Sequence, residues 1–292
     1  WEYYAMNAGL NQNAWGELLQ DERSSRQLLN AGETRLQQQA ANIMEAHNDN
    51  FNTPAFADGY WVMFDYNRGY SDDLESSGIM SLERLPKFSY YFYQSQRDAD
   101  DFGGPLANGY MAHIGSYWQA DSSLNFHVYS NADEVELFLN GRSLGKGKKD
   151  VERYGKVNHP PVLFQLDTFE PGALVAKAMA DGKVVASHTV ATPGKPAQLS
   201  LVMEDTSIAA QTGQNDLVFV YAQLLDAKGN PTRVNGAKVN FSISGDIELV
   251  SPAERKSEAG IAAALVKIGD TLESVRIEAS YNALTAETLT FK

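Results

Sequence analysis

A chain of 292 residues, 43% of them hydrophobic and 21% charged, has the composition of a globular protein with room for two or three domains. Its formal net charge of −13 argues against nucleic acid and against an anionic membrane surface as partners, because both require clustered Lys and Arg. The absence of Cys excludes disulfides and thiolate metal sites, and the five His show no metal-ligand spacing. We therefore expect no metal and no cofactor.

Residues 1–118 carry the clearest helix signals and all four Trp residues of the chain. Apolar residues at helical spacing predict helices near 33–47 and near 86–97. Between them, an aromatic and β-branched run predicts a buried strand near 59–65 that ends in a loop. Helix, strand, loop and helix form an α/β pattern, but one strand and two helices cannot form a closed hydrophobic core by themselves. This segment is therefore expected to be incomplete and not to close a barrel.

After Trp118 the hydrophobic period changes to two, which is typical of strands. Two tight turns are expected, at Asn140-Gly141 and at Asp181-Gly182, because both dipeptides favour hairpins of type I′. The alternating runs that flank these turns are residues 124–129, 135–139, 174–180 and 183–190. Short strands with frequent turns predict an antiparallel sandwich over residues 119–193.

A second all-β unit is expected over residues 197–292. The sequence Thr-Pro-Gly-Lys-Pro at 192–196 separates it from the first, since two prolines cannot donate to a β-ladder. Further alternating runs, at 239–243 and 275–279, favour a second sandwich.

The candidate site lies at the C-terminal end of the strand near 59–65. Trp61, Asp65, Asn67 and Arg68 combine a flat indole face, suited to the C–H face of a sugar ring, with donors and acceptors for hydroxyl groups. Because strand residues alternate, Trp61, Met63 and Asp65 are expected on one face. The alternative is that Trp61 packs in the core and that Asp65 and Arg68 belong to a salt-bridged loop.

Residues 60–66, Tyr-Trp-Val-Met-Phe-Asp-Tyr, resemble the eighth-strand signature of family 2 glycoside hydrolases of the β-galactosidase type. Residues 77–80 and 85–96 resemble the sequence that leads into the last barrel helix of the same enzymes. Residues 131–145 are similar to the strand and hairpin of the immunoglobulin-like domain that follows the barrel. The last domain resembles the immunoglobulin-like or invasin-like modules of long family members.

The resemblance implies a multidomain fold. Residues 1–118 would be the C-terminal part of a (β/α)8 TIM barrel, followed by an immunoglobulin-like β-sandwich over 119–193 and a second immunoglobulin-like or invasin-like β-sandwich over 197–292. It also implies a carbohydrate partner, a terminal β-galactoside or a galactan oligosaccharide. A periplasmic or extracellular location is expected for the parent protein.

Family members are retaining enzymes that use one Glu as acid/base and another as nucleophile. The resemblance places both upstream of Trp1, so this chain alone is expected to be inactive. Glu2 is an alternative nucleophile, but two Tyr follow it where the family has Gly. Glu2 is instead expected to orient another group or to contact sugar hydroxyls, and Tyr3 is expected either to line the pocket or to lie in a solvated loop. A non-enzymatic carbohydrate-binding or adhesion protein built of immunoglobulin-like modules is the competing hypothesis.

Two other features have structural and functional interpretations. His47 and His113 are expected to be structural, since lone His residues usually are. A small basic run follows the Asn-Gly turn and is interpreted either as a solvated hairpin tip or as a glycan contact; it comprises Arg142, Lys146, Lys148 and Lys149.

Overall fold

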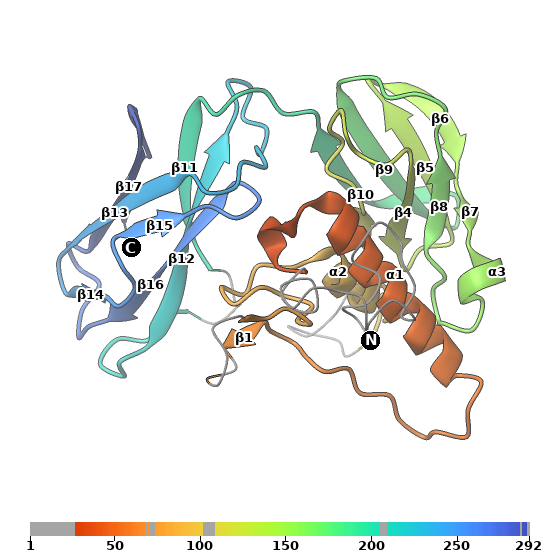
Figure 1. The fold of residues 1–292 in the computed structure, drawn as a ribbon, viewed down its shortest axis with the longest axis horizontal. Helices are drawn as coiled ribbons and strands as arrows, with labels where there is room; N and C mark the ends of the chain where they lie inside the picture. The colour runs from red at the N-terminus through yellow and green to blue at the C-terminus, as the bar shows by residue number, and fades with distance from the viewer. Residues whose placement is uncertain are drawn as a thin grey trace, which may run out of the picture. The chain divides into compact units, whose positions relative to one another are not determined.

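The computed structural model describes residues 27–67, 69, 74–101, 109–204, 209–286 and 288–290. The fold is mostly β-sheet with few helices (Figure 1). Two compact units divide the chain, residues 1–192 and residues 193–292. Within the described residues, no helix is long and apolar enough to cross a membrane.

The first unit contains two helices that pack against each other, α1 (Glu33–Asn50) and α2 (Phe88–Ser95). A short 3-10 helix, η4 (Leu29–Ala31), precedes α1. The buried face of α1 holds apolar side chains three or four residues apart, which confirms the helix predicted near 33–47; they are Leu36, Ala40, Ile43 and Met44. The second helix is shorter than predicted because Pro86 precedes it and Lys87 is its N-cap.

The strand expected near residues 59–65 is much shorter in the structure. Within this segment only Phe64 takes part in a bridge between described residues, a parallel one with Met80. The chain then continues into β1 (Tyr66–Asn67), which pairs antiparallel with β2 (Leu74–Glu75). A regular strand needs a continuous ladder of hydrogen bonds with a neighbouring strand. Among the described residues, such pairing is limited to the Phe64 bridge and to the two residues of β1.

Two four-stranded sheets complete the first unit. One has the order β10-β9-β5-β6 and the other β3-β4-β8-β7, with a short helix α3 (Val151–Tyr154) after β7. The strands are β3 (Ala112–Ile114), β4 (Asn125–Ser130), β5 (Glu134–Leu139), β6 (Arg142–Lys146), β7 (Lys148–Lys149), β8 (Val162–Gln165), β9 (Ala173–Ala180) and β10 (Lys183–Ala191). All the pairings are antiparallel.

The two sheets enclose one hydrophobic core. Both contribute alternate apolar residues to it, and fully buried Trp118 lies within it. The indole N–H of Trp118 donates to the carbonyl of Glu170 at 3.1 Å, so the buried ring keeps a hydrogen bond. Because β3 pairs with β4, this sheet begins at Ala112, upstream of residue 119.

Both predicted hairpin turns are confirmed by the backbone. Asn140 and Gly141 have φ of 52° and 82°, and Asp181 and Gly182 have φ of 50° and 71°. Positive φ at both central residues is what a type I′ turn requires. The second turn joins β9 to β10, and the first joins β5 to β6.

The second unit also consists of two antiparallel sheets around one core. Strands β11, β12, β16 and β14 form the first sheet; β15, β13, β17 and β18 form the second, with β19 also pairing with β17. Their bounds are β11 (Gln198–Met203), β12 (Leu217–Leu225), β13 (Lys238–Ser244), β14 (Ile247–Leu249), β15 (Glu254–Lys256), β16 (Ile261–Ile268), β17 (Arg276–Tyr281), β18 (Leu284–Thr285) and β19 (Leu289–Thr290).

Candidate functional site

Trp61 is presented to solvent with 68% of its surface exposed. Its indole N–H donates to the hydroxyl of Tyr66 at 3.3 Å, and the two rings meet edge to face with centroids 6.1 Å apart. Tyr66 is itself held by the pairing of β1 with β2. The peptide bond between Trp61 and Val62 is cis. This exposure does not fit the alternative in which Trp61 packs in the core.

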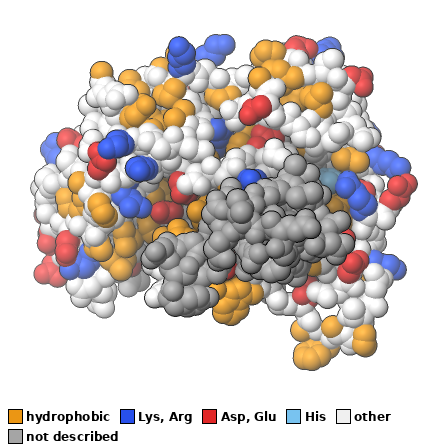
Figure 2. Space-filling view, in the orientation of Figure 1, with side chains coloured by type: hydrophobic (Ala, Val, Ile, Leu, Met, Phe, Trp, Pro, Cys, Tyr) orange, Lys and Arg blue, Asp and Glu red, His pale blue; other side chains and the backbone are white. Residues whose placement is uncertain are grey.

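The segment that carries Trp61 exposes other large apolar side chains. They are Phe51, Phe56, Met63 and Phe64. Figure 2 shows hydrophobic side chains at the lower right, over the loop that follows α1. An exposed group of aromatic side chains is typical of a surface that binds a ligand or another part of a protein.

A small pocket of about 290 Å³ lies beside Trp61, and aromatic and polar side chains line it. Asp58 is the acidic group of this pocket. Its carboxylate contacts His47 Nδ1 at 2.5 Å and accepts a hydrogen bond from Asn50 Nδ2 at 2.8 Å. Both partners come from the last turn of α1, so the helix fixes the position of the carboxylate. Such a carboxylate can accept hydrogen bonds from ligand hydroxyl groups.

Aromatic rings surround the imidazole of His47. Its centroid lies 5.2 Å from that of Phe51, 5.9 Å from that of Phe92 and 5.5 Å from that of Tyr93, all edge to face. Burial raises the pKa of Tyr93 above its usual range, and the nearby charge of Asp58 adds to this effect. The Tyr93 hydroxyl therefore stays protonated at neutral pH and remains a hydrogen-bond donor in the pocket.

Asp65 is buried, with 1% of its surface exposed. Its Oδ1 accepts hydrogen bonds from Lys87 Nζ at 2.8 Å and from the Gly78 amide at 2.9 Å. Lys87 Nζ also donates to the Ser76 carbonyl at 3.0 Å. Burial raises the pKa of Asp65 to about 6, although Lys87 and the Gly78 amide favour the charged form. The hydrogen bonds of Asp65 and Lys87 therefore connect residues 76–78 to the segment that carries Trp61.

Gly78 allows this close approach. A Cβ added there would lie 2.2 Å from the backbone nitrogen of Asp65, so no larger residue fits without moving the backbone. The three residues expected on one face are therefore separated. Trp61 and Met63 are exposed, whereas Asp65 is buried, because the backbone does not continue as a regular strand through them.

The remaining predicted site residues are distributed as follows. Asn67 is exposed in β1, and its side-chain oxygen accepts a hydrogen bond from the Gly69 amide at 2.9 Å, which forms a local turn. Arg68, Glu2 and Tyr3 lie outside the described residues. The structure thus brings Tyr66 into contact with Trp61, whereas Asp65 is buried and paired with Lys87.

The pocket residues Asp58, Asn50 and Tyr93 were not among the candidates predicted from the sequence. The strand predicted near 59–65 begins after Asp58, and the predicted helix ends near residue 47, so neither element includes Asp58 or Asn50. Continuing the helix by one turn would have placed Asn50 and His47 on the same side, three residues apart. Among the described residues, no cluster of three or more His, Asp or Glu could hold a metal ion.

Comparison with known proteins gives a family match and several relatives. Residues 121–186 match the model of a domain of unknown function, DUF4982. The chain is 34% identical over 194 residues to the β-galactosidase BoGH2A of Bacteroides ovatus, covering 64% of this chain and 21% of that protein. It is 30% identical over 224 residues to a β-galactosidase of Thermoanaerobacter pseudethanolicus, covering 71% of this chain and 29% of that protein.

A putative β-glucuronidase of Formosa agariphila is 30% identical over 203 residues, covering 65% of this chain and 18% of that protein. Among solved structures, a β-glycosidase from Bacteroides vulgatus superposes with a TM-score of 0.65 at 19% identity, over 80% of this chain and 30% of that one. A glycosyl hydrolase family 2 member from Bacteroides cellulosilyticus gives a TM-score of 0.61 at 22% identity, over 86% and 36%. The chain therefore spans about a third or less of the proteins it matches.

Proposed function

Because this chain is related to the family 2 glycoside hydrolases, we propose that it is the C-terminal part of a retaining enzyme that removes terminal β-galactosyl groups from oligo- or polysaccharides. The observation that carries the proposal is the exposed indole of Trp61 beside a pocket with polar and aromatic walls. Such a combination suits a sugar ring, which has an apolar C–H face and a rim of hydroxyl groups.

The proposed reaction requires two carboxyl groups about 5 Å apart, one acting as nucleophile and the other as acid and then base. In this proposal the catalytic pair comes from residues upstream of Trp1, and this chain contributes substrate binding. The Trp61 ring stacks on the sugar in the glycone pocket, and Tyr66 holds the ring in place through the hydrogen bond to its N–H. Asp65 and Lys87 order the segment without touching substrate.

The charge of the pocket favours a neutral glycone over a uronic acid. Asp58 contributes a carboxylate there, and a second carboxylate on the sugar would meet it unfavourably. The two relatives named β-galactosidase also support a neutral galactosyl group. We therefore expect p-nitrophenyl β-galactoside to be a better substrate than p-nitrophenyl β-glucuronide for an enzyme that carries this chain with its upstream segment.

The test is Trp61→Ala in that longer enzyme. We expect kcat/KM to fall at least about tenfold, since the loss of about 1.4 kcal/mol of stacking and orientation is one decade. Phe56→Ala is the matched control, because Phe56 is a fully exposed aromatic residue of the same segment that does not line the pocket. Near-normal kcat/KM in a folded Trp61→Ala enzyme would show that the indole does not bind the sugar.

The 292-residue chain alone provides a second test. We expect no hydrolysis of a chromogenic β-galactoside, because the double displacement needs both carboxylates. Turnover that disappears in Glu2→Gln would contradict this and would place the nucleophile within the chain. A full-length protein that binds galactosides but never hydrolyses them would favour the competing carbohydrate-binding hypothesis.

A further inference from the structure

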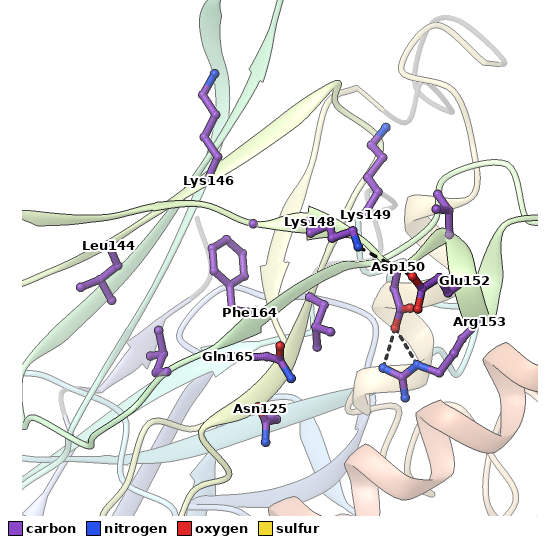
Figure 3. A pocket seen from close by; sticks show the side chains of 14 residues that line it. Asn125, Leu144, Lys146, Lys148, Lys149, Asp150, Glu152, Arg153, Phe164 and Gln165 are labelled. Carbon is purple, nitrogen blue, oxygen red and sulfur yellow. Dashed lines mark hydrogen bonds and ion pairs between the residues drawn. The ribbon is translucent and has the colours of Figure 1, made fainter.

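A larger pocket, of about 730 Å³, lies in the first unit where β7 and β8 meet α3. This volume is within the range of ligand-binding pockets. Figure 3 shows side chains from β4, β7, β8 and α3 around it. The basic run noted in the sequence after the Asn-Gly turn forms part of its wall.

The register of the strands places four lining residues on one face of the sheet. Lys148 of β7 is the cross-strand partner of Leu163 of β8, and Asn125 of β4 is the partner of Gln165 of β8. Leu163 and Gln165 are two residues apart on one strand, so all four side chains share a face. Figure 3 shows Asn125 and Gln165 beside each other at the lower side of the pocket.

The two amides are available to a ligand. Both residues are exposed, and among the described residues neither side-chain amide makes a hydrogen bond. An amide has both donor and acceptor groups, which match the hydroxyl groups of a sugar. Half-buried Leu163 lies on the same face and offers an apolar surface to the C–H groups of a sugar ring.

The charge of the pocket is opposite to that of the chain. In a protein of net charge −13, residues 146–153 carry four basic side chains against two acidic ones, although one of the four, Lys146, is paired with Glu134 of β5. Arg153 is bonded to Asp150 at 2.8 Å. Lys148 is 3.9 Å from Glu152, and both side chains are at least 80% exposed, so this pair is weak. The Lys148 ammonium group is therefore available to an anion.

We propose that this pocket binds an acidic glycan. Lys148 would contact a sulfate or carboxylate group, Asn125 and Gln165 would bind neighbouring hydroxyl groups, and Leu163 would lie under the sugar ring. The inference rests on the proposed function only for the choice of a glycan, and it assigns to the first unit a binding role of its own. A substrate with neutral galactosyl ends and acidic groups within the chain would suit both sites.

The test is calorimetric titration of the 292-residue chain with four probes: a sulfated galactan oligosaccharide, a galacturonate oligosaccharide, a neutral galactan oligosaccharide and inorganic sulfate. We expect at least one acidic oligosaccharide to bind. The neutral oligosaccharide and inorganic sulfate should bind about tenfold more weakly or not at all, because the first lacks the acidic group and the second lacks the sugar ring and its hydroxyl groups. The two acidic probes distinguish sulfate from carboxylate recognition.

Variants of the chain identify the site. Lys148→Gln and Gln165→Ala are each expected to weaken binding of the acidic oligosaccharide by about tenfold, since each removes one contact. Lys183→Gln is the matched control, because it removes the same charge from an exposed residue of β10. Thermal melting checks that all variants fold.

Equal weakening by Lys148→Gln and Lys183→Gln would show a response to net charge alone and overturn the proposal. So would the absence of binding by both acidic oligosaccharides, or sulfate binding as tight as theirs. Binding is measured on this chain without hydrolysis, so a negative result leaves the proposed activity unaffected. Conversely, a longer protein without galactosidase activity would leave the binding result unaffected.

Discussion

Replacing Lys87 with Met should destabilise the first unit strongly and in a pH-dependent way. The Lys87 ammonium group and the Asp65 carboxylate are 2.8 Å apart, and both side chains are 0% exposed. Met has a similar length but no charge. In the variant, Asp65 Oδ1 keeps only the hydrogen bond from the Gly78 amide, and Asp65 Oδ2 already has no partner among the described residues. Removing one member of a buried ion pair costs about 3–5 kcal/mol, because an uncompensated charge stays buried.

The pH dependence follows from the pKa of Asp65, which is about 6 in the folded protein against 3.8 for an unperturbed Asp. A raised pKa means that the folded state holds the proton more tightly than the unfolded state. The free energy of unfolding therefore increases as pH falls through the folded pKa towards 3.8. Without Lys87, which favours the charged carboxylate, this pKa is higher still. Lys87→Met should thus recover part of its lost stability at pH 5 relative to pH 8.

Urea unfolding monitored by Trp fluorescence measures the effect, because all four Trp residues precede residue 119 and lie in the first unit. With a slope of about 2 kcal/mol per molar urea, the midpoint at pH 8 should fall by roughly 1.5–2.5 M. Lys146→Met is the matched control: its ion pair with Glu134 is about half exposed and should contribute less than about 1 kcal/mol. Equal midpoints for the two variants at pH 8, or no recovery at pH 5, would refute the reasoning.

Three other substitutions test the structure elsewhere. Trp118→Ala should cost the first unit about 3–5 kcal/mol in the same urea assay, because it empties a fully buried site in the core; a loss below about 1 kcal/mol would contradict that placement. Gly260→Ala should lower the stability of the second unit by more than about 1 kcal/mol in unfolding followed by circular dichroism. The reason is that Gly260 has φ of +86° and its Cβ would lie only 1.9 Å from the Thr232 carbonyl oxygen; a neutral effect would refute this turn. Trp61→Ala should change the free energy of unfolding by less than about 1 kcal/mol because its side chain is largely exposed, and a larger loss would restore the core-packing interpretation.

Local patterns in the sequence were enough to predict the helix α1 and the two hairpin turns. The apolar residues of α1 recur at the spacing of one helical face, and this face is buried. Asn140-Gly141 and Asp181-Gly182 adopt positive φ as expected, because Asn, Asp and Gly tolerate this backbone region at low energy. The relation to family 2 glycoside hydrolases was also readable from the motifs, and the sequence relatives confirm it.

Tertiary structure alone decided that Trp61 is exposed and Asp65 buried. Period-two alternation placed both on one face, but Trp61 is exposed and Asp65 is buried. The cause lies far along the chain: Lys87, 22 residues later, brings its ammonium group to Asp65, and Gly78 permits the backbone approach. A charge is buried only when a partner of opposite sign meets it, and strand periodicity contains no information about such a distant partner.

The two pockets depended on the same kind of long-range placement. Asn125, Lys148 and Gln165 are scattered over 41 residues of sequence, and the pairing of β4 and β7 with β8 brings them to one face. The sequence by itself determined which segments form helices and hairpins, because those choices depend on neighbouring residues. Which polar groups meet, and which remain open to a ligand, was decided by packing between distant segments, because burial and pairing are properties of the folded chain.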